Sequence, residues 1–197
     1  MSLTQFIDIS LAQSTMAKIT AIRKSKESTY SPASDYWKPL RDGIKKMHQE
    51  GLDLTFLDSI PNAVDPRRRQ NYVEMIKQYK LFCRGREISW FEPPSSYWSE
   101  EGLFVRSTPE LGLHINGKPY LVKLSFKERS EKMDKRGVQT TLTLVRQSTY
   151  ERELDAVRSV LNIRKARLFE PQYPIDDRAV LALTAEAQQI VYLWDKV

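Results

Sequence analysis

The sequence is poor in cysteine and histidine: Cys83, His48 and His114 are the only such residues among 197. A single thiol cannot form an intramolecular disulfide, and a chain without disulfides is typical of a reducing compartment, so we expect a cytoplasmic protein. A tetrahedral structural zinc site needs four thiol or imidazole ligands, and three scattered groups are too few. Cys83 lies in an apolar stretch at residues 81–83, which favours a buried, inert thiol over a catalytic one.

Several standard functional motifs are absent. Only seven glycines are present, and neither GxGxxG nor GxxxxGK[ST] occurs, so the usual dinucleotide and nucleoside-triphosphate loops are excluded. The GxSxG and HExxH patterns are also missing. No apolar run approaches the ~18 residues of a membrane-spanning helix. Basic residues follow the apolar N-terminal section rather than precede it, which is the wrong order for a secretory signal, so we expect no membrane partner.

The chain has enough apolar residues for a core and a modest excess of basic ones. Its hydrophobic fraction is 41% and its formal net charge is +6. A chain of this length buries roughly 70% of its unfolded surface without needing metals or disulfides. The basic excess permits a nucleic-acid partner but does not require one.

The order of the periodic segments predicts an α+β fold. We expect an N-terminal amphipathic helix and linker over residues 1–33, with the helix at 4–26, followed by a single α+β domain over residues 34–197. Helical spacing and capping residues predict helices at 35–50, 65–84 and 176–196. Residues 87–170 favour five to six strands in an antiparallel or mixed sheet covered by helices, including a strand at 140–146 after a solvated, charged loop at 127–137.

Asn116 and Gly117 form the strongest local signal, because an Asn-Gly pair between apolar runs is typical of a two-residue β-hairpin turn. Counting outward from this turn places Glu110 directly opposite Lys123. Opposed residues project to the same side of a sheet with Cβ atoms about 5 Å apart. The sequence therefore predicts a carboxylate–ammonium pair, which is either a cross-strand salt bridge or part of a functional site.

This arrangement resembles the PD-(D/E)XK nuclease superfamily. A helix carrying Glu74 precedes the hairpin, Glu110 follows a proline, and Lys123 lies on the next strand. The resemblance covers roughly residues 66–146 and implies that Glu110 is a metal ligand, that Lys123 positions or activates the attacking water, and that Glu74 supplies a second acid. It also implies Mg²⁺ as the cofactor. Position 121, where the family has an acid, is Leu, so either Glu74 substitutes for it or the site is inactive.

Two further features point to binding. Arg67, Arg68 and Arg69 begin a predicted helix, where the helix dipole opposes cations. A phosphate contact, a solvated face or an ion pair with acids elsewhere would each account for them. Aromatic residues gather around a Pro-Pro pair, and they suit base stacking, a protein partner or sheet covering. These aromatic residues are Trp90, Phe91, Tyr97 and Trp98.

The sequence thus predicts a protein that binds nucleic acid or a phosphate ligand, with a nuclease-like core and vestigial or unusual metal-dependent phosphodiester cleavage. The alternative is a non-enzymatic interaction or accessory subunit that uses the N-terminal helix or the Trp90 and Trp98 cluster to contact a partner.

Overall fold

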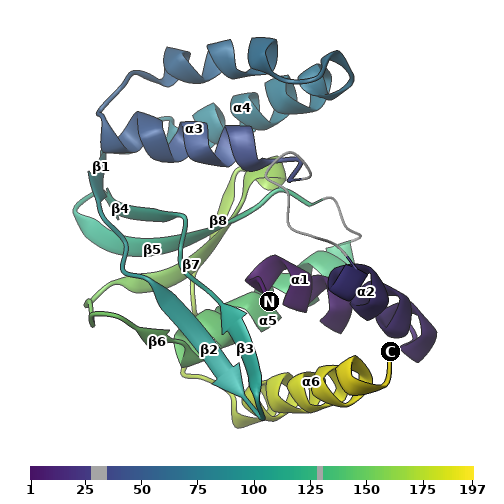
Figure 1. Cartoon of the computed structure of the whole chain (residues 1–197). Helices are drawn as coiled ribbons and strands as arrows, with labels where there is room; N and C mark the ends of the chain where they lie inside the picture. The colour runs from purple at the N-terminus through teal and green to yellow at the C-terminus, as the bar shows by residue number, and fades with distance from the viewer. Residues whose placement is uncertain (28–34, 128–130) are drawn as a thin grey trace.

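The computed structural model describes residues 1–27, 35–127 and 131–197 (Figure 1). Part of the predicted N-terminal linker and residues 128–130 of the predicted charged loop lie outside these ranges. The elements are α1 (Leu3–Ser10), α2 (Thr15–Glu27), α3 (Lys38–Gln49), the 3₁₀ segments η2 (Leu54–Ala63) and η3 (Pro66–Arg68), α4 (Arg69–Cys83), β1 (Ile88–Phe91), β2 (Ser96–Glu100), β3 (Leu103–Arg106), β4 (Leu111–Ile115), β5 (Lys118–Ser125), α5 (Glu131–Gln147), β6 (Thr149–Tyr150), β7 (Val157–Asn162), the 3₁₀ segment η4 (Ile163–Lys165), β8 (Arg167–Phe169) and α6 (Asp177–Lys196).

A mixed five-stranded sheet forms the centre of the molecule, with strand order β1-β4-β5-β7-β8. The β5–β7 pair is parallel and the other pairs are antiparallel. A parallel pair needs a long crossover connection, and α5 lies within the connection here. The predicted α+β fold, with its mixed sheet and helical N-terminal region, is confirmed.

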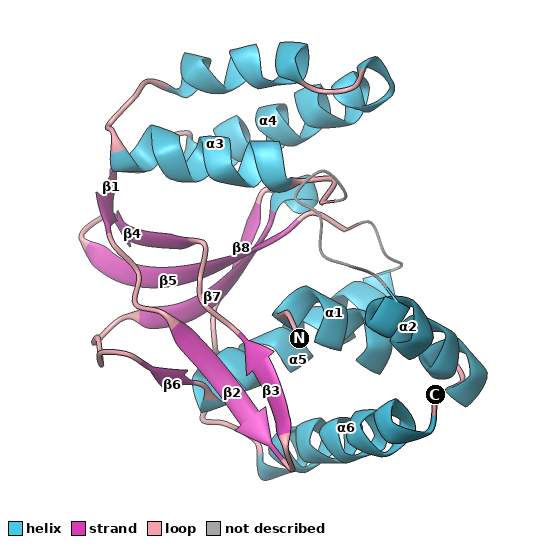
Figure 2. Ribbon diagram, viewed as in Figure 1, coloured by secondary structure: helices cyan, strands magenta, loops and turns pink. Residues whose placement is uncertain are grey.

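The five-stranded sheet is covered on both faces (Figure 2). α3 and α4 pack on one face, where Leu161 joins their core residues. On the other face Val160 packs with Val138 and Leu142 of α5. Adjacent residues of β7 therefore point into different cores, as the alternation of side chains along a strand requires.

A second core lies beside the first, beneath the three-stranded sheet β3-β2-β6. Phe6 of α1 is fully buried there, and its ring contacts that of Trp98 edge-on at a centroid distance of 5.5 Å. Leu183 and Ile190 of α6 complete this core. The apolar side chains of α1 thus lie in a core built by the chain's own β2, β3, α5 and α6.

The single helix predicted for residues 4–26 is wrong, because the chain forms α1 and α2 instead. Ser2 caps α1 in a capping box with Gln5. Ser14 Oγ accepts a hydrogen bond from the backbone N–H of Ala17 (3.1 Å), so a second cap begins α2. The apolar spacing hid this break, since buried residues continue on both sides of it.

The strand predicted for residues 140–146 is also wrong, because these residues belong to α5, which also includes residues 131–137 of the predicted loop. The run of threonine, leucine and valine alternates like a strand. Three threonines instead donate their hydroxyl groups to the carbonyl four residues earlier, for example Thr143 to Gln139 (3.0 Å). Val138, Leu142 and Val145 then fall on one buried helical face.

The hairpin is confirmed in both turn and register. Asn116 and Gly117 have φ values of 50° and 80°, and Ile115 pairs with Lys118. Within the described ranges, no helix has the length and apolar character needed to cross a membrane.

His48 on α3 makes the fold sensitive to acid. Its Nε2 lies 2.5 Å from the Tyr79 hydroxyl, and burial lowers the pKa of His48 to about 4. An unfolded chain takes up this proton near pH 6.5, so the unfolded state binds more protons between these values. We expect the free energy of unfolding to fall as pH falls from about 6.5 to about 4, by on the order of 3 kcal/mol.

Urea unfolding of wild type and His48→Gln at about pH 7.5 and pH 4 isolates this effect. The variant cannot titrate at this position, so its loss of stability on acidification should be smaller by the His48 contribution. Equal losses in the two proteins would contradict the prediction.

Candidate functional site

The Glu110–Lys123 pair forms as the hairpin register predicts. Lys123 Nζ lies 2.7 Å from Glu110 Oε1, and only 12% of the Lys123 side chain and 20% of the Glu110 side chain are exposed. Lys123 also donates to the Thr108 carbonyl (2.7 Å), and Glu110 Oε2 accepts from the Leu124 N–H (2.9 Å). Both carboxylate oxygens of Glu110 are therefore engaged within the chain.

A second ion pair lies near this one. Arg41 on α3 donates to Asp35 at 2.6 Å. Burial opposes the charge of Arg41, but the hydrogen bond from Asp35 and the negative charges of Asp35 and Glu110 raise the pKa of Arg41. The carboxylates of Asp35 and Glu110 thus alternate with the cations of Arg41 and Lys123 between α3 and the start of β4.

Glu74 does not join this group. It lies half-buried on α4 and accepts a hydrogen bond from Gln78 Nε2 (2.9 Å). The contacts of Glu110 and Lys123 are with Thr108, Leu124 and each other. The structure therefore brings together Glu110 and Lys123 but not Glu74.

The donor set does not fit Mg²⁺. Magnesium needs oxygen ligands that are free to turn toward it. Among the residues that the structure describes, no three of the types His, Cys, Asp and Glu gather in one place. Position 121 is a buried leucine, and the Glu110 oxygens already accept from Lys123 and Leu124.

Aromatic rings connect the Glu110–Lys123 region to the arginine run. Trp37 stacks on Phe126, at the end of β5, and on Tyr72 of α4, each at a centroid distance of 5.2 Å. Tyr36 packs beside them and carries the guanidinium of Arg68 over its ring at 4.7 Å. Arg68, one of the three predicted phosphate contacts, therefore already packs against the ring of Tyr36.

The arginine run continues as a stripe along α4. Arg69, Val73, Lys77, Leu81 and Arg84 are all exposed and recur at helical spacing. We call these five residues the α4 stripe. Arg69, Lys77 and Arg84 form no ion pair within the described chain, and Arg67 is exposed just before them. The sequence shows Lys77 and Arg84 at this spacing. That they share one exposed surface becomes clear only once the structure shows which face of α4 is buried.

A groove of about 320 Å³ runs beside the stripe, between α4 and η2. Lys77, Lys80 and Arg84 line it, together with the apolar Val73 and Leu81. The lining carboxylate, Asp58, is neutralised by Lys80 at 2.7 Å. The groove wall is consequently basic.

The predicted aromatic cluster is divided between two faces. Trp98 is buried in the second core, whereas Tyr97, its neighbour on β2, points outward and stacks on Phe104 of β3 at 4.7 Å. Trp90 is half-buried on β1 beneath Lys45. Strand alternation accounts for the division, and sequence reasoning missed Phe104 because β2 itself was not predicted.

Comparison with known proteins adds no relative: no protein-family model matches this chain, and no curated protein matches it. Three features of this chain bear on function: the Glu110–Lys123 pair, the α4 stripe with its groove, and the outward aromatic pair Tyr97 and Phe104 on β2 and β3.

Breaking the Glu110–Lys123 pair should destabilise the fold. Lys123→Met leaves the Glu110 carboxylate largely buried without its cation, and removing one partner of a buried pair costs several kcal/mol. Because the pair retains some exposure, we expect a loss of about 2–3 kcal/mol in the free energy of unfolding, measured with urea.

Two variants control this experiment. Lys45→Met breaks the more exposed pair with Glu92 (3.2 Å) and should cost under about 1 kcal/mol. The double variant with Glu110→Gln and Lys123→Met should regain part of the stability lost by Lys123→Met alone. Simple additivity of the two single changes would contradict a coupled pair.

Proposed function

We propose that this chain binds nucleic acid through the α4 stripe and the adjacent Arg67, without metal-dependent cleavage. One observation carries the proposal: cations recur along the exposed face of one helix and have no carboxylate partners among the described residues. Solvated surface cations are ordinary, but a row of them on one face beside a basic groove supports binding of a phosphate backbone.

The spacing of the stripe supports an extended ligand. α4 has 15 residues, so it is about 22 Å long. Arg69, Lys77 and Arg84 are separated along it by about 12 Å and about 10 Å. A small anion would contact one of these groups, whereas a polyanion contacts all of them at once and releases a counterion at each.

The Glu110–Lys123 pair supports binding without cleavage. The resemblance to PD-(D/E)XK nucleases assigns metal binding and water activation to Glu110, Lys123 and Glu74. In this chain the first two neutralise each other, and Glu74 is bonded to Gln78. In our proposal the Glu110–Lys123 pair has a structural role, and it helps to hold the sheet against the aromatic cluster of Tyr36, Trp37, Tyr72 and Phe126.

Fluorescence anisotropy with labelled single-stranded and duplex DNA tests this proposal. We expect binding that weakens steeply with salt. In parallel, Mg²⁺- and Mn²⁺-dependent cleavage is assayed on DNA and RNA, with Lys123→Ala as the control. Absent or salt-independent binding would contradict the nucleic-acid proposal. Cleavage that Lys123→Ala abolishes would contradict the proposed lack of catalysis.

A second candidate function, a protein-interaction subunit, is favoured by the outer face of α6. Leu181 and Tyr192 are strongly exposed there, while the opposite face of the helix is buried in the second core. A chain that acts only through these apolar groups would not bind the labelled DNA, so the same titration separates the two functions.

A further inference from the structure

The outward face of the β2–β3 ladder carries an aromatic pair that the α4 stripe does not use. Tyr97 and Phe104 are 40% and 56% exposed, and their rings stack with an interplanar angle of 18°. Large rings on a sheet surface usually lie under a helix or another sheet. Here β2 and β3 lie at the surface of the molecule, over α5 and α6 (Figure 2).

The register defines which side chains share this face. Tyr97 pairs with Arg106, and Ser99 pairs with Phe104, so all four project to the same side. Arg106 is exposed and is the one charged residue among the four. The acids of the intervening turn lie elsewhere: Glu100 projects to the Trp98 side, and Glu101 accepts a hydrogen bond from Gln188 of α6 (3.3 Å).

The strand that carries Arg106 is connected along the chain to the Glu110–Lys123 pair. The chain passes from Arg106 of β3 to Thr108, whose hydroxyl accepts from the Ser96 N–H of β2 (3.0 Å). The Thr108 carbonyl then accepts from Lys123 Nζ (2.7 Å). Arg106 is therefore two residues along the chain from the threonine whose carbonyl holds Lys123.

We infer that Tyr97 and Phe104, with Arg106 beside them, form a stacking platform for unpaired bases of a single-stranded nucleic acid. This inference rests on the proposed nucleic-acid function and specifies its substrate class. Exposed rings bind bases of any sequence by stacking, and the neighbouring guanidinium supplies a contact for the phosphate backbone. A duplex keeps its base faces covered, so the platform selects single strands.

The test compares two probes, an oligothymidylate of about 15 nucleotides and a duplex of about the same length, by fluorescence anisotropy at about 0.1 M salt. The variants are Phe104→Leu alone and together with Tyr97→Leu. Tyr173→Leu, which removes another exposed tyrosine from the segment before α6, is the matched control.

We expect each platform substitution to weaken oligothymidylate binding about tenfold, with duplex affinity unchanged within about twofold. Tyr173→Leu should change neither affinity. Unchanged oligothymidylate binding by the double variant, or equal losses on both probes, would overturn the platform while leaving binding by the α4 stripe intact. Absence of binding to both probes by wild type would overturn the proposed function and the platform together.

Discussion

Replacing Arg69, Lys77 and Arg84 together by glutamine is expected to weaken duplex binding by roughly 10²–10³-fold at about 0.1 M salt. Each cation that neutralises a phosphate releases counterions, and the affinity losses from removing three such contacts multiply. Glutamine keeps most of the side-chain length and the helix propensity, so α4 should remain folded. Anisotropy titrations of wild type and the triple variant measure the change.

A matched triple variant separates this effect from net charge. Arg23, Lys24 and Arg178 are exposed on α2 and α6, which lie on the other side of the five-stranded sheet from α4 (Figure 1). Their replacement by glutamine lowers the net charge from +6 by the same three units. It should reduce affinity by less than about threefold. Equal losses in both triple variants would contradict a localised binding surface.

Phe6→Ala should lower the free energy of unfolding by about 3–5 kcal/mol. Phe6 is fully buried in the second core, and its ring contacts that of Trp98 edge-on. Truncation removes buried apolar surface and leaves a cavity. An effect of this size requires that α1 is part of the folded core rather than an arm that waits for a partner.

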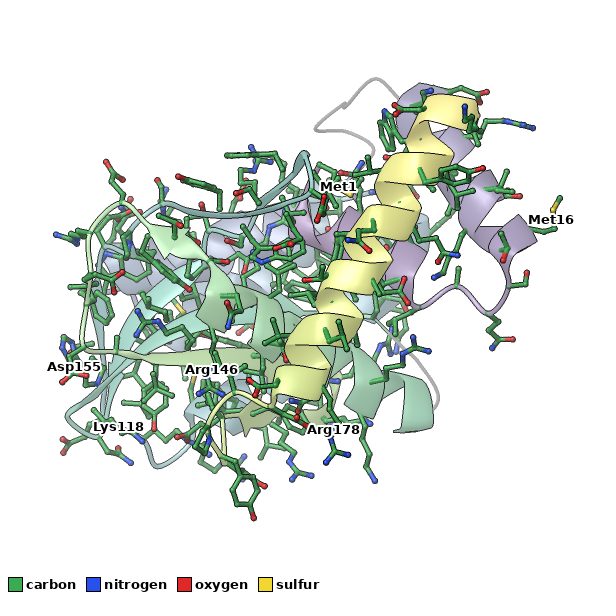
Figure 3. All side chains as sticks on the ribbon, turned by 90° about the horizontal axis from the view of Figure 1, so that it is seen from below. Met1, Met16, Lys118, Arg146, Asp155 and Arg178 are labelled. Atoms are coloured by element: carbon green, nitrogen blue, oxygen red, sulfur yellow. The ribbon has the colours of Figure 1, made fainter. Side chains whose placement is uncertain are left out.

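Urea unfolding monitored by tryptophan fluorescence and by far-UV circular dichroism measures this loss. Met16→Ala is the control, because Met16 projects away from the body of the molecule (Figure 3). It should cost less than about 0.5 kcal/mol. A Phe6→Ala effect below about 1 kcal/mol would show that the second core does not depend on α1.

Local signals predicted the hairpin and its ion pair because both depend on a few neighbouring residues. A two-residue turn sets the register, and the register sets which side chains oppose each other, so Glu110 and Lys123 follow from Asn116 and Gly117 alone. Capping residues likewise marked the start of α6, where Asp176 accepts from the Arg178 N–H (3.0 Å).

Elements that depend on tertiary packing were predicted wrongly or missed. The β-branched residues of α5 alternate like those of a strand. The segment is nevertheless helical, because a helix buries Val138, Leu142 and Val145 against β7 and the second core. Strand β2 follows two prolines and mixes aromatic with polar residues. It forms because its start pairs with β6 through Ser96 and Tyr97, while Tyr97 to Glu100 pair with β3.

The candidate site was predicted only where its residues are close in sequence. Arg67, Arg68 and Arg69 are visible as a run. The participation of Tyr36 and Trp37 depends on α3 meeting α4 and the end of β5, which no local pattern encodes. The divergence of Glu74 from Glu110 is likewise a matter of how α4 is rotated on the sheet, since Glu74 lies between its buried face and the α4 stripe.

The most direct test of a phosphate-binding α4 stripe is the slope of log affinity against log salt concentration for a DNA duplex. The slope is about −0.9 for each phosphate contact. Wild type should therefore show a slope more negative by about 2.7 than the triple variant at Arg69, Lys77 and Arg84. The matched variant at Arg23, Lys24 and Arg178 should keep the wild-type slope. Identical slopes for wild type and the α4 variant would contradict the proposal.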